Sequence, residues 1–322
     1  MNENKIFDNK IVIMKKIFSL LVLGCGLYIS AAGQDSTQTK EEAPTAKFTK
    51  NTFRSTRIIN MQSVEMQPKG YLQFMISHHF GNIWNDDGGA QNIAQLLGIN
   101  SGVAHTYLAF DYTPINNLNL GIAATGNAVF EGWAKIRLLR QQTGAKNYPV
   151  TIVWHSLFNV DASNNPVDNN FVWNRFSFLH QILIARKFSN KFSLQLMPSM
   201  VHYNVSPYGV NNNTNNNIFS IGIGGKYAIS SKKNLTFEYS RQINMYNNVL
   251  DKSGSIVNYK PNLMSIGYEI FTGGHTFQFF IGNTTSAVNI EQLSRNTHGL
   301  QLGQWAIGFH LNRSFAAKKE KE

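Results

Sequence analysis

Large apolar side chains occupy alternate positions near the C-terminus of this chain, at Trp305, Ile307, Phe309, Leu311 and Phe315. Because successive residues of a strand point to opposite faces, the pattern predicts a strand with one apolar face and one small or polar face. The alternation returns about a dozen times along the sequence, as in barrels that turn their apolar face to lipid. We therefore predict an all-β fold, a transmembrane antiparallel up-and-down β-barrel of about 12 strands.

The connections between the predicted strands alternate in length. A barrel of this kind has short periplasmic turns, long outer loops and an even number of strands. The strands fall at 72–80, 104–112, 118–124, 134–138, 150–158, 176–184, 192–200, 219–227, 235–239, 264–270, 277–281 and 305–315. Short connections are 114–117, 141–149, 189–191, 230–234 and 272–274, and long ones are 81–101, 159–171, 204–217, 246–260 and 283–302, with 126–130 as the exception.

The ends of the chain lie outside the predicted barrel, which occupies 70–315. Residues 1–33 read as a cleaved signal peptide, with Lys15 and Lys16 before an apolar stretch and small residues before Gln34. Met14 is an alternative true start, and Cys25 lies in a poorer, lipoprotein-like cleavage box. Residues 34–47 predict a disordered periplasmic leader, and 316–322 form a charged tail. Cleavage before Gln34 removes Cys25, the one cysteine, and with it disulfide chemistry.

The composition fits a membrane barrel better than a soluble domain. Charged residues make up 15% of the chain, against about 25% in ordinary soluble domains. The formal net charge is +11, and removal of 1–33, which carries four lysines and two carboxylates, leaves +9. Lys and Arg are spread over strands and turns rather than gathered in a basic run, which argues against nucleic acid as a partner. We expect contact with outer-membrane lipid headgroups instead.

The opposite parity of the strands predicts the residues of the lumen. Charges of both signs occur there, which suits either a thin aqueous pore or a paired polar plug. Lys135 and Arg137, two apart on one face, form either an anion-attracting ladder or structural pairs with Glu131 or Glu238. The predicted lumen-lining residues are His79, His105, Asp111, Glu131, Lys135, Arg137, His155, Arg175, Lys226, Glu238, Glu269 and His310.

The segment before the first strand, 48–69, has no clean barrel face. We predict that its stretch 53–66 forms a plug folded in the lumen or across its mouth, which contains the charged residues Arg54, Arg57 and Glu65. The two arginines are expected to pair with interior carboxylates. The alternative is an extra periplasmic strand or a linker.

Short motifs in the same stretch resemble a known family. They are Ser55-Thr56-Arg57-Ile58-Ile59-Asn60, Ser63-Val64-Glu65, Gly70, His78-His79-Phe80-Gly81, Glu131-Gly132 with Lys135, and Leu138-Leu139-Arg140-Gln141. With these the chain resembles, over about 50–315, the uncharacterised outer-membrane barrel proteins of Bacteroidota grouped as domain of unknown function 5777. The resemblance implies a barrel in the outer membrane and supplies no catalytic residues.

The last strand also resembles the C-terminal signature of bacterial outer-membrane proteins. Such strands end in Phe and are read by the barrel-insertion machinery, which the resemblance makes an expected partner. Trp305, Phe309 and Phe315 would carry the signature, and the tail 316–322 departs from it by following the Phe.

No pattern in the chain predicts an enzyme, a metal site or a cofactor. There is no Gly-x-Ser-x-Gly, His-Glu-x-x-His or phosphate-binding loop motif. His78 and His79 point to opposite faces of a strand and cannot share a metal ion. We expect an outer-membrane barrel, exported through its signal peptide, that acts as a narrow channel or transporter for small polar solutes or ions and is gated by 53–66. The alternative is a non-conducting structural or partner-binding barrel that acts through its long outer loops.

Overall fold

The computed structural model describes residues 45–82, 105–163, 172–205, 216–244, 249–250, 256–257, 262–296, 299–300 and 304–317. The predicted signal peptide, nearly all of the predicted leader and most of the charged tail lie outside these residues.

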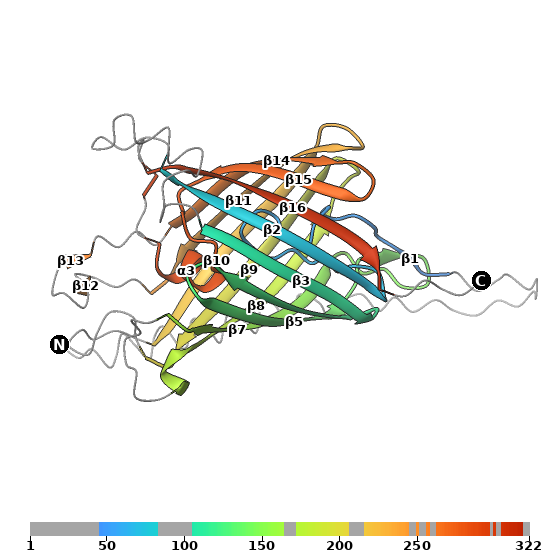
Figure 1. The fold of residues 1–322 in the computed structure, drawn as a ribbon. Coiled ribbons are helices and arrows are strands. Elements are labelled where there is room, and N and C mark those ends of the chain that lie inside the picture. The colour runs from blue at the N-terminus through green and yellow to red at the C-terminus, as the bar shows by residue number, and fades with distance from the viewer. Residues whose placement is uncertain are drawn as a thin grey trace, which may run out of the picture. The chain divides into compact units, whose positions relative to one another are not determined.

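Twelve antiparallel strands close into a barrel, which confirms the predicted fold class and strand number (Figure 1). Each strand pairs with the next one along the chain, and the last strand pairs with the first to close the barrel. The strands are β2 (Tyr71–Asn82), β3 (His105–Ile115), β4 (Leu118–Thr125), β5 (Val129–Leu139), β7 (Thr151–Asp161), β8 (Phe176–Lys187), β9 (Phe192–Tyr203), β10 (Asn217–Ala228), β11 (Lys233–Gln242), β14 (Asn262–Phe271), β15 (His275–Gly282) and β16 (Ala306–Ala316).

The outer surface of the barrel is apolar, as the alternation predicts. Along β10, Phe219, Ile221 and Ile223 are exposed, while the residues between them are buried. A wall that turns its large apolar side chains outward is stable in lipid and unfavourable in water. No helix in the described ranges is long and apolar enough to cross a membrane.

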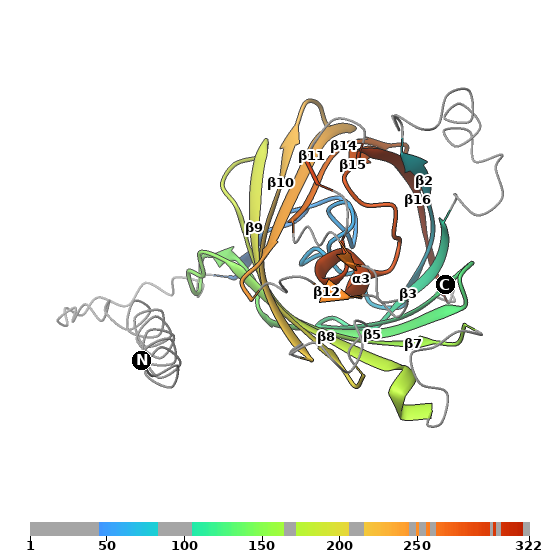
Figure 2. The same cartoon turned by 90° about the vertical axis from the view of Figure 1, so that its left-hand side faces the viewer.

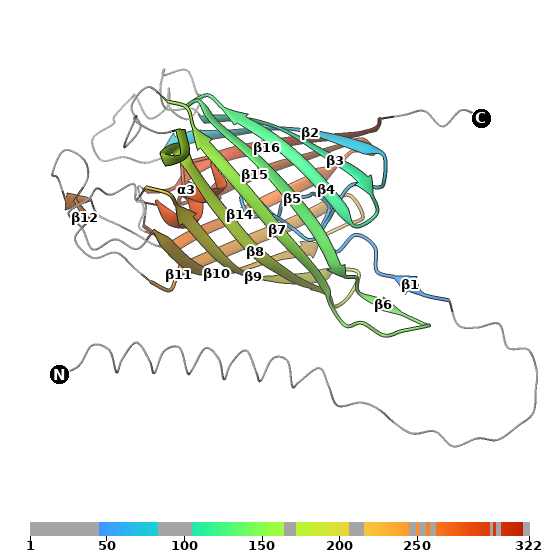
Figure 3. The same ribbon diagram turned by 90° about the horizontal axis from the view of Figure 1, so that it is seen from below.

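One end of the barrel carries the short turns. Residues 116–117, 188–191, 229–232 and 272–274 join neighbouring strands there, and 140–150 also belongs to this end. In barrels of this type the short turns face the periplasm, so we call this the periplasmic end and the opposite one the outer end. Between β5 and β7, the short strand β6 (Gln142–Thr143) pairs with β1 (Lys47–Phe48), which precedes the barrel (Figure 3).

Four further elements belong to the outer end of the barrel. The strands β12 (Val249–Leu250) and β13 (Ile256–Val257) pair with each other. The 3₁₀ helix η1 (Val172–Arg175) leads into β8. The short helix α3 (Asn289–Ser294) belongs to the connection between β15 and β16 and lies inside the barrel, as the view along its axis shows (Figure 2).

The interior of the barrel is less polar than the alternation of the predicted strands indicates. Leu157 on β7 and Leu179 and Leu183 on β8 point inward and are fully buried. They belong to one apolar cluster with side chains of the segment before β2 and of α3. On this side the inner face of the strands is not small or polar as the alternation predicts, because here the wall packs against other parts of the chain instead of water.

Candidate functional site

Residues 52–66 fold into a hairpin inside the lumen, which we call the luminal hairpin. The Ile58 amide donates to the Met61 carbonyl over 2.8 Å, and the Ser63 amide donates to the Thr56 carbonyl over 2.9 Å. All its side chains except those of Arg54 and Glu65 are buried. In the view along the barrel axis the hairpin lies within the ring of strands, beside α3 (Figure 2).

Glu238 on β11 holds the tip of the hairpin. Its carboxylate accepts the Asn60 amide at 2.9 and 3.1 Å, the Met61 amide at 3.0 Å and the Asn60 side-chain amide at 2.6 Å. The side chain of Asn60 also donates to Ser265 Oγ over 2.8 Å. A buried carboxylate with this many N–H donors has its charge met by hydrogen bonds rather than by a cation.

Lys135 on β5 holds the hairpin from the other side of the barrel. Its Nζ donates to the Thr56 carbonyl over 2.7 Å and to the Ser63 carbonyl over 3.2 Å. The side chain is fully buried. Lys135 therefore forms neither an anion-attracting ladder with Arg137 nor a direct pair with Glu131 or Glu238, because its ammonium group points at the backbone of the hairpin.

A chain of hydrogen bonds joins the hairpin to α3. Arg57 donates to the Tyr107 hydroxyl over 2.5 Å, and that hydroxyl donates to the Glu131 carboxylate over 2.7 Å. The backbone and side-chain amides of Asn289 donate to the same carboxylate at 3.1 and 3.0 Å. Gln292 also reaches the Asn60 side-chain carbonyl over 3.2 Å. Hairpin and helix thus form one hydrogen-bonded body across the lumen.

The expected pairing of the plug arginines with interior carboxylates is wrong as a direct contact. Tyr107 stands between Arg57 and Glu131, and the guanidinium of Arg57 lies 4.6 Å from the centroid of the Tyr107 ring. Arg54 donates to the Ser231 carbonyl over 2.5 Å and lies over the Phe271 ring. Within the described part of the chain, the ion pair at salt-bridge distance joins Glu291 on α3 to Arg295, which directly follows the helix.

Neutral side chains on the wall hold the remaining backbone groups of the hairpin. Gln195 accepts the Val64 amide over 2.8 Å and donates to the Gln62 carbonyl over 2.7 Å. Gln278 donates to the Ile58 carbonyl. Because these bonds come from β9 and β15, the hairpin is held from several sides of the barrel at once.

Of the twelve predicted lumen-lining residues, nine are buried in the structure and three are half-buried. Asp111 accepts Thr56 Oγ1 and Trp133 Nε1, at 3.2 and 3.0 Å. Lys226 donates to the Asn51 carbonyl over 2.8 Å, and Glu269 accepts from Asn234 over 2.8 Å. The half-buried three are His105, Arg137 and Arg175, of which Arg175 lies on η1 and donates to the carbonyls of Asp161 and Ser163.

The predicted histidines do not gather at one point. His79 and His310 lie near each other, with ring centroids 6.0 Å apart, whereas His155 contacts Gln181 at 2.9 Å on β8. His79 pairs in register with His105 on β3. Within the described ranges, no three His, Cys, Asp or Glu side chains are grouped so that they could hold a metal ion.

The three residues of the predicted insertion signature lie along the last strand and just before it. Trp305 precedes β16, Phe309 faces outward with its side chain half-buried, and Phe315 is exposed near the end of the strand. Phe315 pairs in register with Leu72 on β2, beside the closure of the barrel.

Sequence reasoning missed the neutral residues that carry most of the contacts. Tyr107 and Gln195 have interior parity but no charge to draw notice, and Asn289 and Gln292 were assigned to an outer loop. The spacing of Ile290 and Leu293, three residues apart as on a helix face, is the signal that could have indicated a helix turned to the core.

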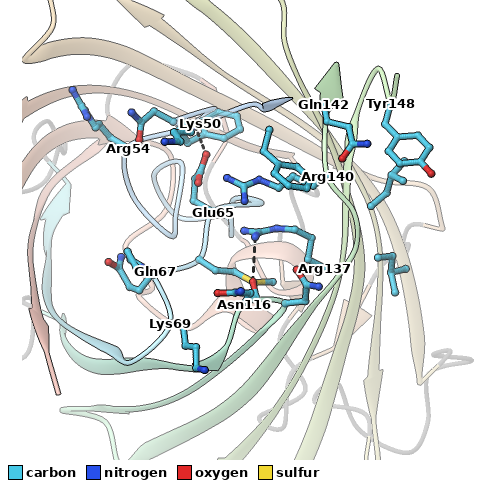
Figure 4. A pocket seen from close by; sticks show the side chains of 18 residues that line it. Lys50, Arg54, Glu65, Gln67, Lys69, Asn116, Arg137, Arg140, Gln142 and Tyr148 are labelled. Atoms are coloured by element: carbon cyan, nitrogen blue, oxygen red, sulfur yellow. Dashed lines mark hydrogen bonds between the residues drawn. The ribbon is translucent and has the colours of Figure 1, made fainter. Parts of the chain in front are cut away.

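Two polar cavities lie at the ends of the lumen, with the hairpin and α3 between them. The outer vestibule has a volume of about 280 Å³ and lies among His105, Asn127, Glu291 and Arg295. The periplasmic vestibule is larger, about 910 Å³, and lies at the base of the hairpin (Figure 4). Its charged side chains are Lys50, Arg54, Glu65, Lys69, Arg137 and Arg140.

The fold is similar to those of solved outer-membrane barrels. An outer membrane channel from Pseudomonas putida F1 is 11% identical, with 78% of this chain and 98% of that chain covered and a TM-score of 0.50. The NanC porin is 8% identical, covers 76% of this chain and 98% of its own, and has a TM-score of 0.47. The KdgM porin is 8% identical, with 75% and 99% covered and a TM-score of 0.44. At these identities the likeness concerns the fold alone.

No curated protein matches the chain in sequence. The family model DUF5777, described as a membrane bound beta barrel domain, matches residues 53–315, which run from the luminal hairpin to the last strand. The match confirms the resemblance that the short motifs carry. The chain belongs to this family of membrane-bound β-barrel domains.

Proposed function

We propose that the protein is a narrow outer-membrane channel or transporter for small polar solutes or ions, and that the luminal hairpin closes it. The observation that carries the proposal is that two charged side chains of the barrel wall have the backbone of the hairpin as their hydrogen-bond partner. Lys135 is bonded to carbonyls of the hairpin and Glu238 to its amides. Both wall charges therefore lose their partners, and regain water, when the hairpin leaves.

A barrel that only had to be filled would not need these charges. Burying an ion costs several kcal/mol unless hydrogen bonds replace its water. The wall around Leu157, Leu179 and Leu183 shows that this interior also accepts apolar packing. Charges aimed at a separable segment support a lumen that is aqueous in a second, open state.

The ends of the lumen support the same proposal. Polar cavities of about 910 Å³ and 280 Å³ lie at the periplasmic and outer ends. With the hairpin withdrawn, a path between them would run past Lys135, Glu131 and Glu238, all of which face the interior. The likeness to the Pseudomonas putida channel extends to the fold only, so the proposal rests on the lumen itself.

Export through a cleaved signal peptide and assembly by the barrel-insertion machinery belong to the proposal. N-terminal sequencing of the protein isolated from outer membranes should begin at Gln34. A start further upstream would contradict cleavage after Gly33.

The test is single-channel recording in planar bilayers. The mature chain should show rare or small openings, and a variant that lacks 48–66 should show steady, larger current steps. A variant that lacks only 34–46 keeps the hairpin and β1, and it should behave like the mature chain. Folding of each protein is checked by heat-modifiable mobility in detergent gels.

The contrary result is equally clear. If folded and inserted protein passes no current with or without the hairpin, the barrel is non-conducting. The search would then move to protein partners of the long loops 81–101 and 283–302.

A further inference from the structure

The periplasmic vestibule holds a concentration of positive charge that the closing of the lumen does not use. Five cationic side chains and one carboxylate line it, a formal excess of +4. The cations come from separate parts of the chain, with Lys50 and Arg54 before or within the hairpin, Lys69 after it, and Arg137 and Arg140 at the end of β5. The fold therefore brings them together at one cavity (Figure 4).

The three arginines of the vestibule bond to neutral backbone oxygens. Arg54 donates to the Ser231 carbonyl, Arg137 to the Asn116 carbonyl over 3.3 Å and Arg140 to the Thr49 carbonyl over 3.2 Å. None of the three lies within 4.0 Å of a carboxylate of the described residues. A guanidinium has five N–H donors, so each of these bonds leaves most of the group's capacity for another acceptor.

The one carboxylate of the vestibule serves the hairpin. Glu65 Oε1 accepts the Phe53 amide over 3.1 Å, which closes the base of the hairpin. This bond gives Glu65 a structural role that does not depend on the surrounding cations.

Ring contacts fix two of the guanidinium groups. Arg140 lies 5.0 Å from the centroid of the Phe48 ring, and Arg54 lies 4.4 Å from that of Phe271. Cation–π contacts of this kind hold a guanidinium plane in place while its edge stays available to an acceptor. The Arg137 Nε atom is shielded from solvent and has no partner in the structure.

From these observations we infer that the periplasmic vestibule binds small organic anions that carry two or more carboxylate or phosphate groups. Arginine is the residue best suited to bidentate binding of both groups. A volume of about 910 Å³ admits a molecule of metabolite size. Binding at this site does not require the lumen to open, so the inference stands apart from the proposed conduction.

Isothermal titration calorimetry of the folded mature protein in neutral detergent at low salt tests the site, with citrate and inorganic pyrophosphate as probes. We expect saturable binding that weakens as salt rises. The double variant Arg137→Gln/Arg140→Gln should bind the probes with an affinity at least about tenfold lower. The matched control Arg186→Gln/Arg313→Gln removes two exposed arginines outside the vestibule and should bind as the parent does.

Two further variants separate loss of the site from loss of the fold. Arg137→Lys/Arg140→Lys keeps the charge and should retain part of the affinity. Lys50→Gln/Lys69→Gln changes exposed lysines outside the barrel strands, so weaker binding by this variant would point to the vestibule and not to a misfolded wall. No binding of either probe by the folded parent, or equal binding by every variant, overturns the inference.

A lipid phosphate is the other source of the same chemistry. The titration is therefore repeated in nanodiscs of phosphatidylcholine with and without phosphatidylglycerol. Unchanged affinity supports a free anion as the ligand. Loss of citrate binding in phosphatidylglycerol would show that a lipid headgroup takes the site, and the inference of a soluble ligand would fail.

Discussion

Lys135 and Glu238 hold the luminal hairpin from nearly opposite walls of the barrel, the lysine through carbonyls of the hairpin and the glutamate through its amides. Their strands, β5 and β11, are five positions apart by the shorter way around the ring. Both sets of bonds are charge-assisted and buried, which makes each wall residue a separate test of how firmly the hairpin is held.

Glu238→Gln should loosen the tip of the hairpin. In the parent, both carboxylate oxygens of Glu238 accept N–H groups of Asn60 and Met61. Glutamine keeps the shape of the side chain but replaces one of these acceptor oxygens with an NH₂ group, which cannot accept a hydrogen bond from them. We expect a loss of about 1–3 kcal/mol in the free energy of hairpin attachment. In planar bilayers the variant should open more often than the parent, whereas Asp161→Asn, at the outer rim, should not. Unchanged gating with Glu238→Gln would contradict a gate held at Asn60 and Met61.

Lys135→Met should loosen the other side of the hairpin by a similar amount, because methionine fills the volume but donates no hydrogen bond to Thr56 or Ser63. Lys233→Met, at an exposed position, is the control. If both wall residues act on one hairpin, the double variant Lys135→Met/Glu238→Gln should differ from the sum of the single effects. Strict additivity in thermal unfolding and in open probability would show that the two ends are held independently.

Tyr107→Phe should uncouple the hairpin from α3. The change removes the hydroxyl that joins Arg57 to Glu131 and leaves a buried guanidinium without its acceptor. Thermal unfolding in detergent should show destabilisation of about 1–3 kcal/mol. Tyr227→Phe removes a hydroxyl from an exposed, outward ring and should change nothing measurable. Equal stability of the two variants would mean that the Arg57–Tyr107–Glu131 chain does not contribute.

Gly224→Val should displace the hairpin by collision. A Cβ built at Gly224 meets the end of the Ile58 side chain at 2.6 Å, so valine at this position requires at least that side chain of the hairpin to move. We expect larger or more frequent current steps from a barrel that still folds. Gly274→Val, where a Cβ meets nothing within 4 Å, is the matched control. A closed Gly224→Val barrel would show that the hairpin shifts without opening a path.

The sequence predicted the outer surface of the barrel because lipid imposes one rule on every strand. Outward residues that face the hydrocarbon region must be mostly apolar, so Phe219, Ile221 and Ile223 on β10 could be assigned without knowing their neighbours. The interior obeys no such rule. Leu179 faces inward and belongs to one apolar cluster with Leu157, Leu183 and side chains of the hairpin, and no local pattern predicts that cluster.

The partners of the interior charges were also beyond the reach of sequence. The alternation places Lys135 and Glu238 on the inner face. Their partners are backbone carbonyl and amide groups, which every residue carries, so the sequence cannot indicate which of them are used. Sequence can therefore suggest only pairs of charged side chains, whereas the structure joins Lys135 to Thr56 and Ser63 through their main-chain oxygens.

The hairpin lies before β2 in the chain, and the barrel closes when β16 pairs with β2. Upstream, the two-residue pairing of β1 with β6 and a few hydrogen bonds of residues 49–51 link it to the periplasmic end. Withdrawing the hairpin toward the periplasm would thus break no rung of the barrel, whereas α3 is tethered on both sides by β15 and β16. Of the two bodies that fill the lumen, the hairpin could therefore leave while the barrel stays intact, whereas α3 is anchored to barrel strands at both ends.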